Sequence, residues 1–255
     1  YRVQSLPQSM LPLVWDFGQL NTTVEEMYIR QMVLRYINNE QLPEVQGLDT
    51  TVSKILTVSQ DFMRAQQDEC SFVSLRDVER VLKVMSWFYS QSQEDNDLFS
   101  LMRGDSDDST TESEEEEEEE TMEMEDQYVD DLTRSLLLAL GVCYHACLKN
   151  RDEYRESVAP YFTPPLRLPG GAHQIAREID RCQEVFLDNV DLAPNIAKNQ
   201  ALKENVFMMI VCIELRIPMF LVGKPGSSKS LAKTIVADAM QGNAAHKALF
   251  KNYKQ

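Results

Sequence analysis

The chain has 255 residues, of which 43% are hydrophobic, so it is long enough for one or two domains with a buried core. Its net charge of −16 is local, because 16 of the 41 acidic residues lie from Asp105 to Asp131 and leave 25 acidic against 25 basic residues elsewhere. The absence of a basic stripe excludes a nucleic-acid-binding surface. Charged residues and a proline interrupt the longest apolar stretch, residues 206–222, which excludes a transmembrane segment.

Cysteine usage indicates a reducing compartment. The number of cysteines is odd and their spacing is irregular, which argues against a disulfide framework. The N-terminus has neither a methionine nor the apolar core of a signal peptide. We therefore expect an excised piece of a cytoplasmic protein, with these five thiols: Cys70, Cys143, Cys147, Cys182 and Cys212.

Helical periodicity predicts a small bundle over residues 1–92, after an irregular lead-in over residues 1–20. Thr22 or Thr23 would cap the first helix, and a second helix would run from about residue 51 to 65. The third begins at a capping box, in which Ser74 and Asp77 each satisfy a backbone N–H of the other. The apolar stripe predicted for the first helix is Val24, Met27, Tyr28, Leu34 and Ile37.

The next segment, residues 93–127, is predicted to be a disordered acidic linker or surface insertion. It contains seven consecutive glutamates, Glu114 to Glu120, whose charges repel and which cannot bury apolar area. A solvated spacer is the simplest interpretation. Recruitment of a basic partner and phosphorylation of serines in the acidic context are the alternatives.

Residues 128–255 read as helices that lead into one strand. We predict an apolar helix over residues 132–148, a Pro- and Gly-rich connector over 150–171, and a helix that begins near Pro194. The run at 217–222 has the composition of a buried strand, and a final helix would cover residues 231–241. Another helix is indicated by apolar residues at spacings of 4, 3 and 4: Ile175, Ile179, Cys182 and Phe186.

The eight residues between that strand and the last helix form a phosphate-binding motif. Strand, glycine-containing loop, Lys-Ser and helix is the layout in which backbone N–H groups and a helix N-terminus face a polyphosphate. Lys229 would reach the β- and γ-phosphates of ATP, and the Ser230 hydroxyl would ligate Mg²⁺. The expected ATP-binding residues are Gly223, Lys224, Pro225, Gly226, Ser227, Ser228, Lys229 and Ser230.

One residue departs from the usual pattern of this loop. Ser228 stands where a glycine normally precedes the lysine, and its Cβ narrows the allowed backbone angles. Gly223 and Gly226 remain, and serine is small, so nucleotide binding is still expected.

Other candidate chemistry is weaker. Cys143, His145 and Cys147 suggest a metal site, but on one helix the histidine would point away from the two cysteines, so we expect buried thiols. Arg76 lies in the first turn of a helix, where the dipole disfavours a cation unless an anion is near. No apolar strand ending in Asp-Glu follows Ser230, so the residues that activate water for ATP hydrolysis are missing and no catalytic residue is assigned.

Four segments resemble AAA+ ATPases of the dynein and midasin type, and more closely the giant AAA+ RING-finger ubiquitin ligases of the mysterin family. They are residues 14–18 (VWDFG), 70–80 (CSFVSLRDVER), 199–206 (NQALKENV) and 217–233, which include the phosphate loop. Serine before the loop lysine is part of this likeness. The resemblance spans nearly the whole chain apart from the acidic tract.

The resemblance implies a mostly α chain at the junction of two ATPase units. Residues 1–92 would be the helical lid of a preceding unit, for which Arg76 would be the sensor-2 arginine. Residues 128–255 would open the next α/β phosphate-loop domain. Zinc and the RING finger would lie outside this chain.

Partners and location also follow from the resemblance. Neighbouring AAA+ units and the ubiquitin-conjugating machinery would be the partners, and the parent protein would lie in the cytoplasm and on lipid droplets. The alternatives are a non-hydrolysing unit that holds ATP as a structural element and, less favoured by the long helical region upstream, a phosphate-loop kinase.

Overall fold

The computed structural model describes residues 5–15, 20–66, 72–93, 98–103 and 128–240. In these residues every regular element is a helix, which confirms the mostly α fold class. The α-helices are α1 (Thr22–Asn38), α2 (Leu48–Ala65), α3 (Leu75–Gln91), α4 (Leu98–Arg103), α6 (Asp131–Cys143), α7 (Arg151–Val158), α8 (Gly171–Asp188), α9 (Gln200–Glu214) and α10 (Lys229–Met240). The 3₁₀ helices are η1 (Gln8–Leu13), η3 (His145–Cys147) and η4 (Ala159–Tyr161).

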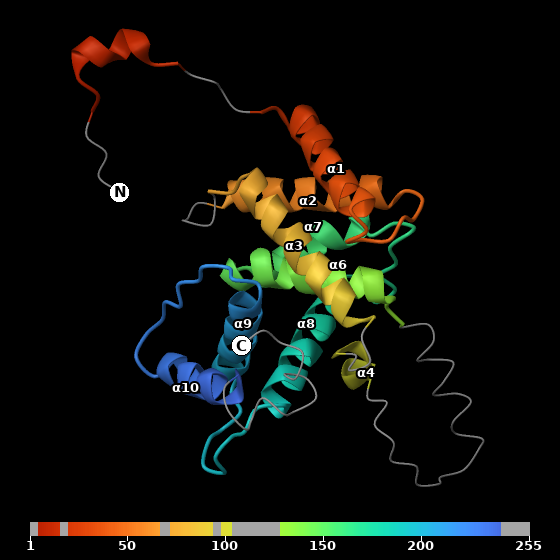
Figure 1. Cartoon of the computed structure of the whole chain (residues 1–255), viewed down its shortest axis with the longest axis vertical. Helices are drawn as coiled ribbons and strands as arrows, with labels where there is room; N and C mark the ends of the chain where they lie inside the picture. The colour runs from red at the N-terminus through yellow and green to blue at the C-terminus, as the bar shows by residue number, and fades with distance from the viewer. Residues whose placement is uncertain (1–4, 16–19, 67–71, 94–97, 104–127, 241–255) are drawn as a thin grey trace.

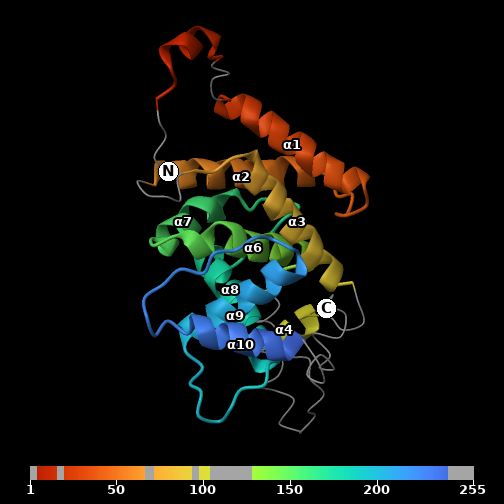
Figure 2. The same ribbon diagram turned by 60° about the vertical axis from the view of Figure 1, so that its left-hand side comes forward.

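The α-helices are stacked from α1 to α10, and η1 lies beyond α1 (Figures 1 and 2). Helices α2 and α3 lie below α1, followed by α6 and α7, and then by α8, α9 and α10. One continuous hydrophobic core joins these layers. The core therefore includes apolar residues from both sides of the acidic tract.

The ends of several helices follow local sequence signals. Both halves of the predicted capping box are formed, because Asp77 accepts from the Ser74 N–H at 2.8 Å and the Ser74 hydroxyl accepts from the backbone at the start of α3. The cap of α1 was predicted wrongly. Asn21, rather than Thr22 or Thr23, accepts from the Val24 N–H at 2.8 Å.

Helix α1 turns a different face inward from the one predicted. Met27 and Tyr28, members of the predicted apolar stripe, are 64% and 53% exposed. The face rotates because Glu25 is buried against Arg64 of α2, whose two terminal nitrogens lie 2.5 and 2.7 Å from the carboxylate oxygens. The buried residues of α1 are Glu25, Ile29, Val33 and Tyr36.

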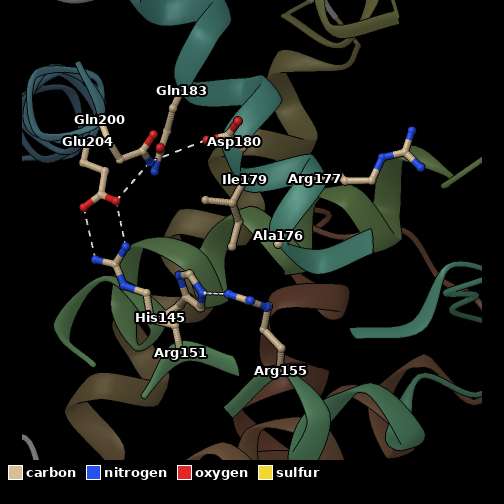
Figure 3. Close-up of a pocket in the computed structure, with 10 residues that line it drawn as sticks. All are labelled: His145, Arg151, Arg155, Ala176, Arg177, Ile179, Asp180, Gln183, Gln200 and Glu204. Carbon is tan, nitrogen blue, oxygen red and sulfur yellow. Dashed lines mark hydrogen bonds and ion pairs between the residues drawn. The ribbon is translucent and has the colours of Figure 1, made fainter. Parts of the chain in front are cut away.

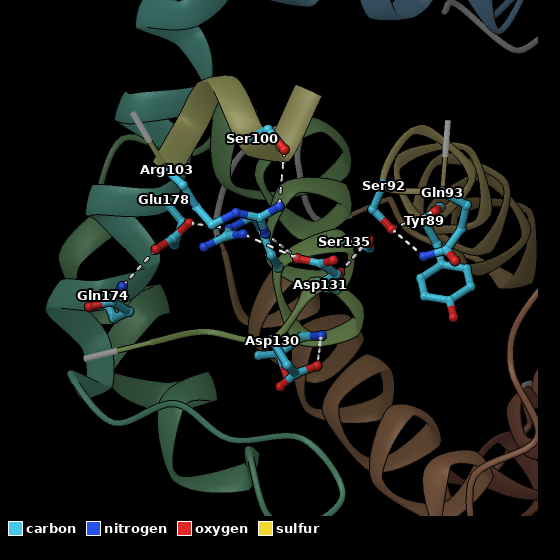
Figure 4. A network of polar contacts seen from close by, with 12 residues as sticks. Tyr89, Ser92, Gln93, Ser100, Arg103, Asp130, Asp131, Ser135, Gln174 and Glu178 are labelled. Carbon is cyan, nitrogen blue, oxygen red and sulfur yellow. Dashed lines mark hydrogen bonds and ion pairs between the residues drawn. The ribbon is translucent and has the colours of Figure 1, made fainter. Parts of the chain in front are cut away.

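A polar network ties α4, α6 and α8 together (Figure 4). Within the core, the Arg134 Nε donates to Glu178 at 2.8 Å, and Gln174 donates to the other carboxylate oxygen at 2.7 Å. Arg103, the last residue of α4, forms an ion pair with Asp131, the first residue of α6, at 3.1 Å. Both charges of the central pair are therefore compensated where burial would otherwise be costly.

Four predictions of secondary structure need correction. Helix α6 ends at Cys143, not at residue 148, and α7 forms within the range predicted as an irregular connector. Helix α9 begins at Gln200, well after Pro194, because the Asn199 side chain caps it. Residues 217–222 do not form the predicted strand, since no described segment offers the backbone partners that a strand requires.

The predicted acidic linker is only partly described. Its acidic tract, residues 104–127, lies outside the described residues. Residues 98–103, also within the predicted linker, form α4 instead and bury three apolar side chains. The buried residues are Leu98, Phe99 and Met102. The prediction rested on the average composition of residues 93–127. It therefore missed that a short apolar helix next to the acidic residues can pack into the core.

Candidate functional site

The predicted phosphate loop connects residues 217–222 to the N-terminus of α10. Its lysine curls back over the loop: the Lys229 Nζ donates to the Gly223 carbonyl at 2.7 Å, the Lys224 carbonyl at 2.8 Å and the Ser227 hydroxyl at 2.8 Å. Three oxygens of the loop thus surround one ammonium group. The loop therefore places the positive charge of Lys229 beside the N-terminus of α10. The helix dipole favours the binding of anions at the same place.

The backbone of the loop shows why small residues occur in it. Gly226 has a φ of +83°, which glycine adopts without a steric penalty. A Cβ at Gly223 would lie 2.7 Å from the Ser227 Oγ, so a side chain there would displace that hydroxyl. Ser228, the unusual residue of the motif, has a left-handed φ of +57°. The sequence departure thus falls on a position where glycine would be less strained.

The loop borders a shallow, open hollow of about 480 Å³. Ser230 lies in the first turn of α10 with an exposed side chain, and the other residues that line the hollow belong to the loop or, in the case of Leu231, to α10. Of the eight predicted residues, only Lys224 does not line the hollow, although its carbonyl accepts from Lys229. The lining residues are Gly223, Pro225, Gly226, Ser227, Ser228, Lys229, Ser230 and Leu231.

One contact to the loop comes from another helix. The Asn205 side-chain amide, in the second turn of α9, donates to the Ser227 carbonyl at 2.8 Å. This residue belongs to the family-like segment 199–206, but its role was not predicted. The only pattern recognised in this part of the sequence was the apolar face of α9. Asn205 is not on that face, so the pattern could not predict its contact with the loop.

Arg76 lies apart from this chemistry. It is exposed in the first turn of α3, and its side chain forms no hydrogen bond or ion pair with the part of the chain that the structure describes. The neighbouring cap residue Asp77 pairs instead with Arg80 at 2.8 Å. A sensor-2 role for Arg76 stays a prediction that concerns a preceding ATPase unit.

The cysteines and His145 do not converge on one another. Cys143 ends α6, whereas His145 and Cys147 belong to η3, and the described residues contain no group of three or more His, Cys, Asp or Glu side chains able to hold a metal ion. Burial raises the pKa of the Cys143 and Cys182 thiols. These thiols are therefore protonated and unreactive. Cys143 is only partly buried and Cys147 is exposed, so the prediction that both are buried is wrong.

A second hollow, of about 310 Å³, is lined by residues of η3, α7, α8 and α9 (Figure 3). Its charged groups are paired: Arg151 contacts the two carboxylate oxygens of Glu204 at 2.7 and 3.1 Å, and Arg155 contacts Asp152 and the His145 Nε2. Burial, and then the two arginines, lower the pKa of His145 to about 4. The imidazole of His145 is therefore neutral, and the charges of both arginines are neutralised by carboxylates. We interpret this hollow as a packing contact between helices and not as a binding site.

Comparison with known proteins agrees with the motifs. A model of the RNF213 AAA domain matches residues 195–255, which contain α9, the loop and α10. Over all 255 residues, the chain is 49% identical to the E3 ubiquitin-protein ligase RNF213 of Homo sapiens, 46% identical to that of Mus musculus and 45% identical to E3 ubiquitin-protein ligase rnf213-beta of Danio rerio. The chain is homologous to a segment of RNF213.

RNF213 is the protein called mysterin, so the predicted family resemblance is confirmed. The chain spans only 4% to 5% of the length of these RNF213 relatives. The match to the RNF213 AAA domain begins at residue 195, five residues before α9. None of the helices in the described part of the chain combines the length and apolarity needed to cross a membrane.

Proposed function

We propose that residues 223–230 bind ATP together with Mg²⁺. The observation that carries the proposal is the convergence of Lys229 on three loop oxygens directly before the N-terminus of α10. In this arrangement the ammonium group can exchange neutral oxygens for the more strongly binding anionic oxygens of a polyphosphate. The Ser230 hydroxyl, exposed in the first turn, would ligate Mg²⁺, which neutralises phosphate charge.

The loop residues fit a polyphosphate in two further respects. Gly223 has no side chain, which leaves room for the Ser227 hydroxyl. A Cβ at residue 223 would lie 2.7 Å from that oxygen. The backbone amides at the start of α10 have no acceptor within their own helix, so they are available as donors. Burial of the α10 residues Ala232 and Ile235 in the core keeps these donors in place.

We further propose that the whole protein is an AAA+ ATPase and ubiquitin transferase. The support comes from its RNF213 relatives, which are named E3 ubiquitin-protein ligases, and from the match to the RNF213 AAA domain. In this proposal the residues that activate water for hydrolysis belong to the rest of the protein, since the chain spans only 4% to 5% of the length of these relatives. The ubiquitin-conjugating machinery would then be a partner of the whole protein in the cytoplasm.

A coupling role is consistent with the packing. In this proposal residues 1–92 act as the helical lid of a preceding unit, and residues 128–255 open the next unit. Lys83 of α3 donates to the Leu215 carbonyl at the end of α9 at 2.5 Å. A change of α9 upon nucleotide binding would therefore reach the lid directly.

The test is nucleotide binding by the full-length protein, measured by titration with a fluorescent ATP analogue and Mg²⁺. Lys229→Ala is expected to lower the affinity of this site by at least about 100-fold, since it removes a charge-assisted contact to phosphate. Lys233→Ala, one turn further along α10 and exposed, is the matched control and should bind as the wild type does. Unchanged binding by Lys229→Ala would refute the assignment.

A further inference from the structure

The side chain of Asn205 connects α9 to the phosphate loop. Its amide nitrogen lies 2.8 Å from the backbone oxygen of Ser227. The helix beneath it is firmly held, because Val206 is buried and Glu204 pairs with Arg151. Asn205 therefore presents its short amide from a fixed backbone position.

Ser227 takes part in four hydrogen bonds. Its N–H donates to the Lys224 carbonyl at 3.3 Å and its hydroxyl donates to the same oxygen at 2.8 Å. That hydroxyl also accepts from Lys229, and its carbonyl accepts from Asn205. The contact from Asn205 is the one among these that originates outside the loop.

The orientation of the Ser227 carbonyl determines where the next amide points. In a planar trans peptide the C=O and the following N–H point in opposite directions. With the carbonyl of Ser227 held toward α9 by Asn205, the N–H of Ser228 is directed away from α9. Ser228 also has the strained φ of +57°, a conformation that persists only when surrounding contacts impose it.

We propose that Asn205 is a positioning residue that aims the Ser228 N–H at the polyphosphate of the nucleotide. The inference rests on the proposed function of residues 223–230. Asn205 does not touch the nucleotide in this scheme. It acts through the Ser227–Ser228 peptide, and it connects the occupancy of the loop to α9.

Two substitutions separate the donor from the size of the side chain. Asn205→Asp keeps the shape but replaces the donor by a carboxylate, which only accepts hydrogen bonds when ionised. Asn205→Leu keeps a similar volume without any polar group. The matched control is Asn189→Asp, because Asn189 is also half-buried and its amide donates to a backbone carbonyl, that of Val185, at 2.9 Å.

The experiment measures binding of MANT-ATP with Mg²⁺, and of MANT-adenosine, to the full-length protein. The MANT-ATP binding that is lost in the Lys229→Ala variant is assigned to this site. We expect both Asn205 variants to weaken that part about 5- to 10-fold, as the loss of one hydrogen bond predicts, with MANT-adenosine binding unchanged. The Asn189→Asp variant should match the wild type.

Three outcomes decide the matter. MANT-ATP binding by Asn205→Asp within twofold of the wild type, with binding lost in Lys229→Ala, would overturn the inference and leave the proposed function intact. Equal weakening of MANT-ATP and MANT-adenosine would also overturn it, because it indicates a general structural role. If Lys229→Ala binds normally, the proposed function itself fails. Should Asn205→Leu not fold, Asn205→Asp decides alone.

Discussion

Phe88 of α3 stacks on Phe207 of α9, with ring centroids 6.4 Å apart and ring planes 19° apart. Both side chains are buried, and Phe186 of α8 packs edge-on against Phe207 at 5.5 Å. The two stacked rings come from opposite sides of the acidic tract. The predicted lid segment and the segment that contains the phosphate loop therefore share one core.

We expect this shared core to unfold as one unit. Phe207→Ala should lower the free energy of unfolding by about 3–5 kcal/mol, the usual cost of removing a buried aromatic ring. Urea unfolding should give coincident transitions by circular dichroism and by tryptophan fluorescence. The fluorescence change should come mainly from Trp87 of α3, because the other tryptophan, Trp15, is already 83% exposed. Phe72→Ala, at an 89% exposed residue, is the control and should change stability by less than about 0.5 kcal/mol. Two separate transitions would contradict the prediction.

The buried ion pair of Arg134 and Glu178 should be costly to break. Both residues are about 5% exposed, so Glu178→Gln leaves a buried guanidinium partly uncompensated and should destabilise the chain by about 3 kcal/mol. Asp188→Asn removes one partner of the exposed pair with Lys198 and should cost less than about 1 kcal/mol. Similar midpoints of urea unfolding for the two variants would be inconsistent with the buried network.

His145 should make stability depend on pH. Its pKa is lowered to about 4 in the folded chain, so between that value and the ordinary 6.5 the unfolded state binds more protons. Stability should fall as the pH drops from about 6.5, with a total loss of up to about 3 kcal/mol near pH 4. The pKa of Glu204 is also lowered from 4.5, but that carboxylate contributes only at lower pH.

Between pH 7 and pH 5, the change of stability with pH therefore reports on His145 rather than on Glu204. His145→Gln should flatten the pH dependence of the unfolding free energy in that range, whereas His173→Gln, at an exposed position, should leave it unchanged. Urea unfolding at several pH values checks this. Parallel curves for His145→Gln and the wild type would rule out the neutral buried imidazole.

Ser228 offers a test of the strained loop that rests on the proposed nucleotide site. Ser228→Gly removes the cost of about 1–2 kcal/mol that a non-glycine residue has in the left-handed conformation. This variant should bind MANT-ATP within about threefold of the wild type or more tightly. Ser228→Val places a branched Cβ at the same φ and should weaken binding at least about tenfold. If glycine weakens binding as much as valine does, the hydroxyl of Ser228 rather than its backbone conformation is what the site requires.

Local signals explain which parts of the fold could be predicted. The capping box of Ser74 and Asp77 joins residues three positions apart, and the buried stripe of α8 repeats within one helix. The phosphate-loop motif is similarly local, but the predicted contact of Lys229 with phosphate stays a prediction. Each of these features is determined by residues that are neighbours in the sequence.

The errors have distant causes. The inward face of α1 depends on Arg64, which lies 39 residues after the buried Glu25. The strand predicted at 217–222 depends on neighbouring strands that no periodicity can supply. Asn205 reaches a carbonyl 22 residues away from a position outside the apolar stripe of its own helix. Such contacts are visible only once the helices are packed.

Arg103, directly before the acidic tract, forms an ion pair with Asp131, four residues after the tract, with 3.1 Å between their charged atoms. The described parts of the chain on the two sides of the tract are therefore in direct contact. Sequence inserted or lost between these two anchors need not move α4 or α6. The length and charge of this segment can therefore vary at little cost to the helical core, since lengthening a loop whose ends stay in place adds little to its entropy cost.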